Sequence, residues 1–242
     1  MLTSRTEFYP WLNAVDKANL GIDPGRRYDL AVTLNAGVLT FKEFAMREPV
    51  PLATIHEAVL EFLRGRDDVV VFGATAVNAY VSEPRMTQEI DLMSPRAEEL
   101  AEELREYVSE RFHIAVRVRT IGQGKGHRLF QVQKAGNRHL VDVRRVDALP
   151  RAQRIEDVLV ISPPELIAQK ILSYHRRKGQ PKSFSDMRDL AMLFLAFPNL
   201  KRESGEVTQI LQSMDANEDL MTAWRELVAQ EISLPDDEDE FE

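Results

Sequence analysis

The stretch VVVFGATAVNAYVSEPRMTQEIDLM, residues 69–93, decides the fold of this chain. Its first four residues are apolar and rich in β-branched side chains, which is typical of a buried strand. Gly73 then opens a turn into a short helical segment, and a polar connection leads to a second strand over residues 89–93. The rest of the chain is organised around this succession of strand, turn, helix and strand.

The second strand places two carboxylates on one face. Side chains on a strand alternate between its faces, so Glu89 and Asp91 point the same way. Ile90 and Leu92 point the other way. Two neighbouring carboxylates repel each other, and a cation between them removes that cost. Magnesium, or manganese in its place, prefers such hard oxygen ligands and also binds phosphate. The alternative is an ordinary solvent-exposed face of an edge strand.

The turn formed by Gly73, Ala74, Thr75 and Ala76 precedes this carboxylate pair by about fifteen residues. Backbone N–H groups at such a turn, where a helix begins, bind phosphate oxygens. This position argues against an exposed strand edge, which stays open as the alternative to a site for a metal-bound phosphate.

Composition and charge limit the class of protein to which this chain can belong. The chain has 242 residues and a mass of 27.7 kDa, with 44% hydrophobic and 29% charged residues, which is ordinary for a folded globular protein. The formal net charge is −8, so any surface for nucleic acid must be a local patch. The chain has no cysteine, which excludes disulfides and a thiol nucleophile. No signal-like or membrane-spanning apolar run is present, so we expect a cytoplasmic protein without a membrane partner.

We expect four segments along the chain. Residues 1–50 carry no motif and are predicted to be an N-terminal extension packed on the core, with a partner-binding or lid role as the alternative. Residues 51–160 are predicted to form an α/β core, and residues 161–234 a helical domain. Residues 235–242, PDDEDEFE, form an acidic tail that is too charged to pack, and we expect it to be disordered.

Within the predicted core, residues 97–112 have the spacing of an amphipathic helix, and strand-like stretches follow at 113–120, 128–133 and 139–143. The linker 122–127, GQGKGH, contains three glycines and a lysine. It lacks Walker spacing and does not lead into a helix, so a mobile hairpin loop is favoured over a phosphate cradle. The basic residues in and after this linker form a cluster that could contact a polyanion: Lys125, His127, Arg128, Lys134, Arg138 and His139.

Two charged residues interrupt apolar patterns. Asp142 lies between two valines in a strand-like stretch, where a carboxylate is costly unless it is paired or binds a metal. An edge or turn-proximal position is the competing account. In the helix that starts at Ser162 or Pro163, Lys170 lies on or beside the apolar stripe. A lysine that extends its ammonium to solvent would explain this position without any function.

The next helix is predicted to begin at Ser183 or Ser185, and it carries Asp186 and Asp189 near its start. Carboxylates at a helix start are favoured by the helix dipole, so neither aspartate needs a function. Residues 205–230 have the apolar spacing of two further helices that pack on the helical half.

The opening stretch resembles the nucleotidyltransferase superfamily, and in particular its bacterial branch related to the type IV abortive-infection (AbiEii-like) toxins. The residues that carry this resemblance are GATA at 73–76 and RMTQEIDL at 85–92. The chain departs from the usual pattern at Ala74, where a second glycine or a serine is common, and at Glu89, where aspartate is common.

The helical half carries a second, independent match to the same branch. It consists of PELIAQK at 164–170, then Arg177 and Lys182, and then DMRDL at 186–190. Both matches occur in the order that the family has. Together they cover roughly residues 68–195.

This resemblance implies an α+β fold, with a nucleotidyltransferase-like mixed sheet core and flanking helices followed by a C-terminal helical domain. It implies transfer of a nucleoside monophosphate from a nucleoside triphosphate to an acceptor hydroxyl, with Mg²⁺ or Mn²⁺ as cofactor. By the same resemblance, the catalytic residues are Glu89, Asp91, Lys170 and Asp186, the nucleotide-binding residues are Gly73, Ala74, Thr75, Arg85 and Lys170, and the metal ligands are Glu89, Asp91 and Asp142.

The resemblance leaves the acceptor open among the 3′ end of a transfer RNA, another RNA, a protein and a small molecule such as an aminoglycoside. The basic cluster favours RNA. In a toxin–antitoxin setting the chain would be the toxin, with a cognate antitoxin as partner. The alternative is a catalytically inactive descendant that binds a nucleotide or a partner, which Ala74 and Glu89 would support.

Overall fold

The computed structural model describes residues 50–134, 136–214 and 216–233. All of these residues fall within one compact unit. The predicted N-terminal extension, apart from Val50, and the predicted acidic tail lie outside the described residues. The predicted boundary between an α/β core and a helical domain near residue 160 stays a prediction. None of the described helices has the length and apolar character that a membrane span needs.

In the described chain, seven strands form one mixed sheet in the order β3-β4-β5-β2-β1-β7-β6. The central strand β2 pairs antiparallel with β1 and parallel with β5, and β1 pairs parallel with β7. This mixed sheet with its flanking helices confirms the predicted α+β class. The strands are β1 (Val70–Phe72), β2 (Ile90–Ser94), β3 (Val116–Ile121), β4 (Gly126–Gln131), β5 (Arg138–Arg145), β6 (Ala152–Ile155) and β7 (Val158–Ile161).

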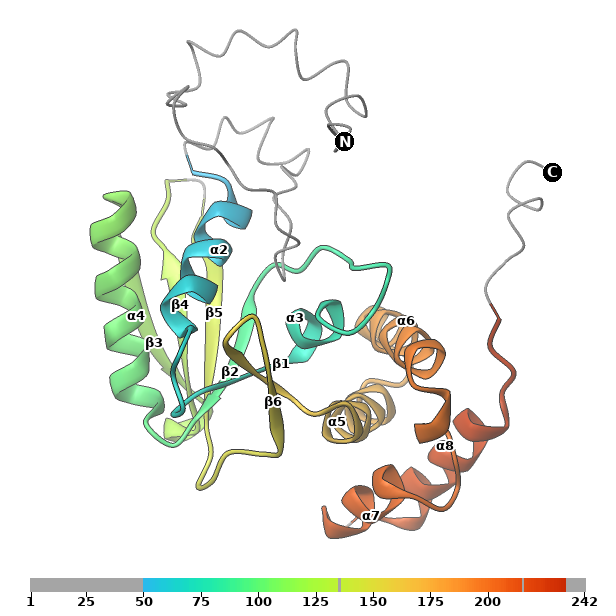
Figure 1. The fold of residues 1–242 in the computed structure, drawn as a ribbon. Coiled ribbons are helices and arrows are strands. Elements are labelled where there is room, and N and C mark those ends of the chain that lie inside the picture. The colour runs from blue at the N-terminus through green and yellow to red at the C-terminus, as the bar shows by residue number, and fades with distance from the viewer. Residues whose placement is uncertain (1–49, 135, 215, 234–242) are drawn as a thin grey trace, which may run out of the picture. The chain divides into compact units, whose positions relative to one another are not determined.

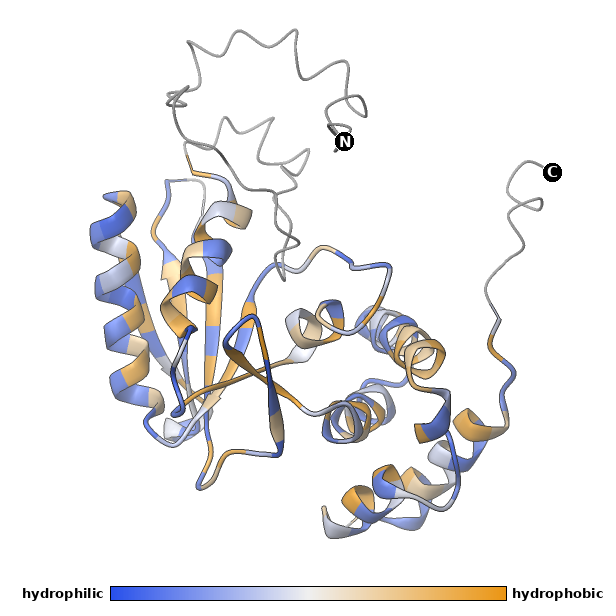
Figure 2. Ribbon diagram, in the orientation of Figure 1, coloured by the Kyte–Doolittle hydropathy of each residue, from blue (hydrophilic) through white to orange (hydrophobic). Residues whose placement is uncertain are grey.

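Two helices, α2 (Leu52–Leu63) and α4 (Ala97–Phe112), pack together and cover one face of the sheet (Figure 1). The bounds of α4 are those predicted from its apolar spacing. Its leucines and valine are buried on the side toward β3, β4 and β5. Figure 2 shows hydrophilic residues along the outer side of the same helix. The other face of the sheet, where Asp91 lies, is therefore left for the site.

Among the described residues, four α-helices follow β7: α5 (Pro163–Arg176), α6 (Pro181–Ala196), α7 (Glu206–Ser213) and α8 (Glu218–Ala229). A proline occupies the first position of both α5 and α6, where its missing N–H leaves no hydrogen bond unmade. α5 packs against α6, α7 and α8. Trp224 of α8 is fully buried beside Phe194 of α6. These helices confirm the helical pattern predicted after residue 161.

The hairpin of β6 and β7 was not predicted from the sequence. Its two-residue turn consists of Glu156 and Asp157, which have φ values of 49° and 66°. Turns of this kind are usually marked by Asn-Gly or Asp-Gly, because glycine and asparagine tolerate positive φ. A Glu-Asp turn gives no such signal.

The start of α6 also differs from the prediction. The helix begins at Pro181 with Gln180 as its N-cap, so the prediction that Ser183 or Ser185 caps it is wrong. The Ser183 hydroxyl instead donates to the carbonyl oxygen of Gln180. Asp186 therefore lies beyond the first turn, and the favourable helix dipole no longer explains its position.

Candidate active site

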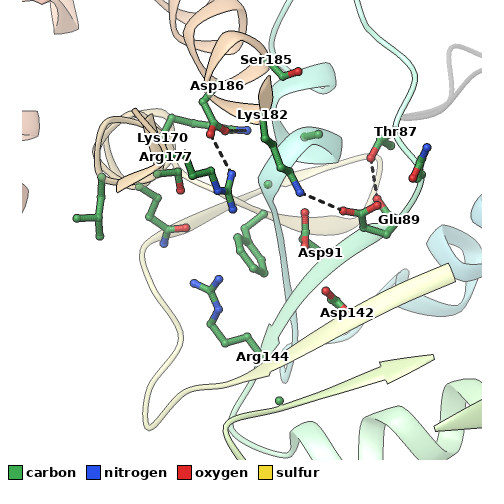
Figure 3. Close-up of a pocket in the computed structure, with 18 of the residues that line it drawn as sticks. Thr87, Glu89, Asp91, Asp142, Arg144, Lys170, Arg177, Lys182, Ser185 and Asp186 are labelled. Atoms are coloured by element: carbon green, nitrogen blue, oxygen red, sulfur yellow. Dashed lines mark hydrogen bonds and ion pairs between the residues drawn. The ribbon is translucent and has the colours of Figure 1, made fainter. Parts of the chain in front are cut away.

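A cavity of about 880 Å³ lies between the strands β2 and β5 and the helices α5 and α6. Figure 3 shows carboxylates on the sheet side and charged side chains of α5 and α6 facing them. Thr75 is the predicted site residue that does not line this cavity; its side chain is fully buried and its hydroxyl has no partner within the described structure. The cavity brings together the other predicted residues: Gly73, Ala74, Arg85, Glu89, Asp91, Asp142, Lys170 and Asp186.

Asp91 and Asp142 are direct neighbours across the sheet. They are paired in register on the parallel strands β2 and β5, so their side chains leave the same face. No hydrogen bond from the described residues reaches the Asp91 carboxylate. Its pKa is raised to about 6, chiefly by burial and then by the negative charges of Glu89 and Asp142. Asp91 is thus a crowded carboxylate that a cation would stabilise.

Gly73 is packed directly against this carboxylate. Its φ is 69°, a left-handed conformation that residues with a side chain rarely adopt. A Cβ atom at Gly73 would lie 2.1 Å from Oδ2 of Asp91, well inside any tolerable contact. α3 (Gly73–Asn78) begins at this glycine, so the absence of a side chain lets the helix start approach the carboxylate strand.

Asp142 is paired rather than free. Arg128 donates to its two oxygens from Nε at 2.7 Å and Nη2 at 2.8 Å, and His139 Nε2 lies 2.8 Å from Oδ1. Burial by itself would raise the pKa of Asp142, but the hydrogen bonds from His139 and Arg128 outweigh it and lower the pKa to about 2. Its position is interior to the sheet, so the edge-strand account of this aspartate is wrong.

Two members of the predicted basic cluster, Arg128 and His139, therefore act as partners of Asp142. His139 also lies between the two acids, with Nδ1 3.9 Å from Oε2 of Glu89. Among the residues that the structure describes, no three His, Asp or Glu side chains lie close enough to hold a metal ion together. The three predicted metal ligands, Glu89, Asp91 and Asp142, therefore lie near one another but are not arranged to hold a metal ion together.

The helical wall of the cavity contains Lys170, which is 7% exposed. Its Nζ donates to Oδ2 of Asp189 at 2.6 Å and lies 3.5 Å from Oδ1 of Asp186. The interpretation of Lys170 as a lysine that extends to solvent is wrong, since its ammonium is paired inside the protein. Asp186 also accepts from Nη1 of Arg177 at 2.9 Å.

Two charged residues, Asp189 and Lys182, were noted in the sequence but were not predicted as site residues. Asp189 is fully buried and binds both Lys170 and Arg85, although its spacing three residues after Asp186 on one helix could have indicated a shared face. Lys182 reaches toward Glu89 from the first turn of α6, with 3.8 Å between Nζ and Oε1 (Figure 3). Neither contact can be read from local periodicity.

The glycine-rich linker connects β3 to β4 as a hairpin with one short 3-10 turn (Gly122–Gly124), which confirms the hairpin prediction. Gly122 and Lys125 nevertheless line the cavity. Lys125 is thus a member of the predicted basic cluster that lines the site.

Known proteins resemble this chain in sequence family and in fold. The model of the family described as "Nucleotidyl transferase AbiEii toxin, Type IV TA system" matches residues 57–237. No curated protein matches the chain by sequence. Among solved structures, the Megavirus polyadenylate synthase is similar with a TM-score of 0.52 and 13% sequence identity, over 65% of this chain and 34% of that chain. The chain thus spans about a third of the length of that enzyme.

Two further solved structures are similar over most of their length. JHP933 from Helicobacter pylori has a TM-score of 0.45 and 12% identity, over 79% of this chain and 90% of that chain. ANT(2″)-Ia in complex with adenylyl-2″-tobramycin has a TM-score of 0.40 and 15% identity, over 78% of this chain and 100% of that chain. At these identities the likeness to the polyadenylate synthase bears on the fold alone. Because the family model spans well over half of the sequence, the chain belongs to the AbiEii family of nucleotidyl transferases.

Proposed function

We propose that this nucleotidyltransferase moves a nucleoside monophosphate from a nucleoside triphosphate to an acceptor hydroxyl. The observation that supports the proposal best is the meeting of Glu89 and Asp91 with Lys170 in one cavity. The acids come from the sheet and the amine from the helices. Phosphoryl transfer depends mostly on positioning and charge neutralisation, which such an arrangement supplies.

The donor set on the sheet fits a divalent cation such as magnesium or manganese. Carboxylate oxygens are the ligands these ions prefer, and Asp91 is crowded by two other acids without a hydrogen bond from the described residues. Glu89 and Asp91 would hold the ion. Asp142, which already contacts Arg128 and His139, would join them as a third ligand. When bound, the ion would neutralise charge on the triphosphate and polarise its α-phosphate.

The remaining cavity residues have roles toward the triphosphate. Backbone N–H groups at Gly73 and Ala74, where α3 begins, would bind phosphate oxygens. Thr75 would contribute its backbone only, since its side chain does not reach the cavity. Lys170 and Arg85 would add fixed positive charge, and Asp186 would orient Lys170.

In the reaction, the acceptor oxygen forms a bond to the α-phosphorus while the bond from that phosphorus to the bridging oxygen breaks and pyrophosphate leaves. The proton of the acceptor hydroxyl must be taken up at the same time. One carboxylate of the site would take up this proton. Lys170 and Arg85 would stabilise the charge of the departing pyrophosphate.

The charge of the cavity favours RNA as the acceptor. Within the described structure, nine Lys or Arg residues line the cavity against four Asp or Glu, although the whole chain has a net charge of −8. Such a local excess attracts a phosphate backbone and repels a polycation. An aminoglycoside, the kind of molecule bound in adenylylated form by ANT(2″)-Ia, is polycationic and fits this cavity poorly. The 3′ end of a transfer RNA is one candidate of this kind, and another RNA is the alternative.

The family description also supports a biological setting. Its members are toxins of type IV toxin–antitoxin systems, so we propose that this chain acts as the toxin and has a cognate antitoxin. Growth arrest on expression of the wild type, together with normal growth on expression of Asp91→Asn, would support this role. Arrest by both forms would exclude nucleotidyl transfer as its cause.

Transfer of label from α-³²P nucleoside triphosphates to total RNA tests the reaction. We expect labelled RNA with the wild type and magnesium, and at least about a hundredfold less with Asp91→Asn. Equal labelling by the two proteins would refute the assignment of Asp91. Triphosphate binding without transfer to RNA, protein or small molecules would instead favour the alternative of an inactive nucleotide-binding module.

A further inference from the structure

Asp189 holds two cations of the cavity wall at once. Its carboxylate accepts hydrogen bonds from Nε of Arg85 at 2.7 Å, from Nη2 of Arg85 at 2.8 Å and from Nζ of Lys170 at 2.6 Å. The Asp189 side chain is fully buried and does not line the cavity, whereas Arg85 and Lys170 both do. Asp189 therefore lies behind the two cations as seen from the cavity.

The charges of this group leave a net positive charge facing the cavity. Burial would raise the pKa of Asp189, but the hydrogen bonds and charges of Arg85 and Lys170 outweigh it and hold the pKa low. With Asp186 and its partner Arg177 included, three cations and two carboxylates are joined, which leaves one positive charge. That charge is directed at the space where a triphosphate would lie.

The same contacts join separate parts of the chain. Arg85 belongs to the connection between α3 and β2, and Asn78 holds its backbone on both sides, at 3.0 Å from the Arg85 N–H and 2.7 Å from the Arg85 carbonyl oxygen. Lys170 lies on α5 and Asp189 on α6. A path of direct contacts thus runs from the helix that starts at Gly73 to the helical wall.

We propose that Asp189 is a positioning residue of this active site, which sets the separation and orientation of the Lys170 ammonium and the Arg85 guanidinium for the triphosphate. This inference rests on the proposed triphosphate site. It differs from a purely structural ion pair, because loss of Asp189 would weaken nucleotide binding in folded protein as well as stability. Two cations left without their shared partner repel each other and move apart.

Asp68 offers a matched control. It also accepts three contacts from two arginines, Arg66 at 2.9 and 2.8 Å and Arg96 at 3.1 Å, but it lies outside the cavity. The dissociation constants of all four nucleoside triphosphates with magnesium are measured by calorimetry for the wild type, Asp189→Asn and Asp68→Asn in full-length folded protein. We expect Asp189→Asn to weaken binding at least about tenfold and Asp68→Asn to leave it within about twofold, although both lose stability.

A double-mutant cycle shows whether Asp189 acts through Lys170. In a Lys170→Met background, Asp189→Asn is expected to weaken nucleotide binding by clearly less than in the wild type. Equal weakening in both backgrounds would overturn the inference. If Asp189→Asn does not fold, Asp189→Glu keeps the charge but moves the carboxylate by one methylene. Weaker nucleotide binding by Asp189→Glu supports positioning, and binding equal to wild type contradicts it.

The two proposals can fail separately. A wild type that binds none of the four triphosphates refutes the proposed function itself. A wild type that binds, with Asp189→Asn and Asp68→Asn equal to it in affinity, refutes only the positioning role of Asp189.

Discussion

Asp91→Asn should stabilise this protein in the absence of a divalent metal, even though it should abolish transfer. The Asp91 carboxylate makes no hydrogen bond to the described residues and is crowded by Glu89 and Asp142. Its negative charge therefore opposes folding. Asparagine has nearly the same shape and carries no charge, so the substitution removes this opposition without leaving a cavity.

The magnitude follows from the shift in pKa. The Asp91 pKa rises from an ordinary value of 3.8 to about 6 in the folded protein. Between these values the folded state binds more protons than the unfolded state, so the free energy of unfolding falls as the pH rises through this window. The full shift lowers the free energy of unfolding by about 3 kcal/mol at pH 7.5 and by about 1 kcal/mol at pH 4.5. Because Asp91 is mostly buried but keeps some contact with solvent in the cavity, we expect a gain of about 1 to 3 kcal/mol in the free energy of unfolding at pH 7.5.

Thermal unfolding with a metal chelator at pH 7.5 and pH 4.5 measures this gain. In a chain of this size, 1 kcal/mol shifts the unfolding temperature by roughly 2 to 4 °C. Asp142→Asn is the matched control with the opposite sign, because the Asp142 pKa is lowered to about 2. The stability contributed by Asp142 is present above pH 3.8 and is lost as the pH falls toward 2. Asp142→Asn should therefore lower the free energy of unfolding by about 2 kcal/mol at pH 7.5.

Two results would refute this reasoning. The first is an unfolding temperature for Asp91→Asn at or below that of the wild type at pH 7.5 without metal. The second is a gain of the same size at pH 4.5, because that gain could not come from the ionisation of Asp91. Either result would also weaken the argument that Asp91 is a crowded carboxylate suited to a cation.

Three further predictions follow from the packing and the site. Gly73→Ala should lower the free energy of unfolding in urea by at least about 1 kcal/mol more than Gly179→Ala does, because both glycines have positive φ but only Gly73 lies against Asp91. Equal losses would contradict the close approach of Gly73 to Asp91. Trp224→Ala should lower the free energy of unfolding by about 3 to 5 kcal/mol, since the ring is fully buried, and a loss below about 1 kcal/mol would show that the helical half is loosely packed. Magnesium should raise the unfolding temperature of the wild type more at pH 7.5 than at pH 5, because protons compete for Asp91, and should have little effect on Asp91→Asn.

The local structure of the site could be predicted from the sequence. A run of apolar residues, a glycine and an alternating strand define β1, the start of α3 and β2, because these signals come from neighbouring residues. The period of two predicts Glu89 and Asp91 on one face, and both line the cavity, although β2 itself begins only at Ile90. The period of 3.6 fixes the bounds of α4. The family resemblance added Lys170 and Asp186, which local patterns do not connect with the acids.

What only the tertiary structure decided is how distant residues meet. The parallel pairing of β2 with β5 puts Asp142 beside Asp91, and Arg128 on the next strand then neutralises Asp142. Asp189 binds Arg85 across 104 residues of sequence, and nothing in either local stretch indicates the contact. Local patterns report which side of an element is buried, whereas ion pairing depends on which elements become neighbours. The strand order and the helix packing set those neighbours, and they emerge only when the whole chain folds.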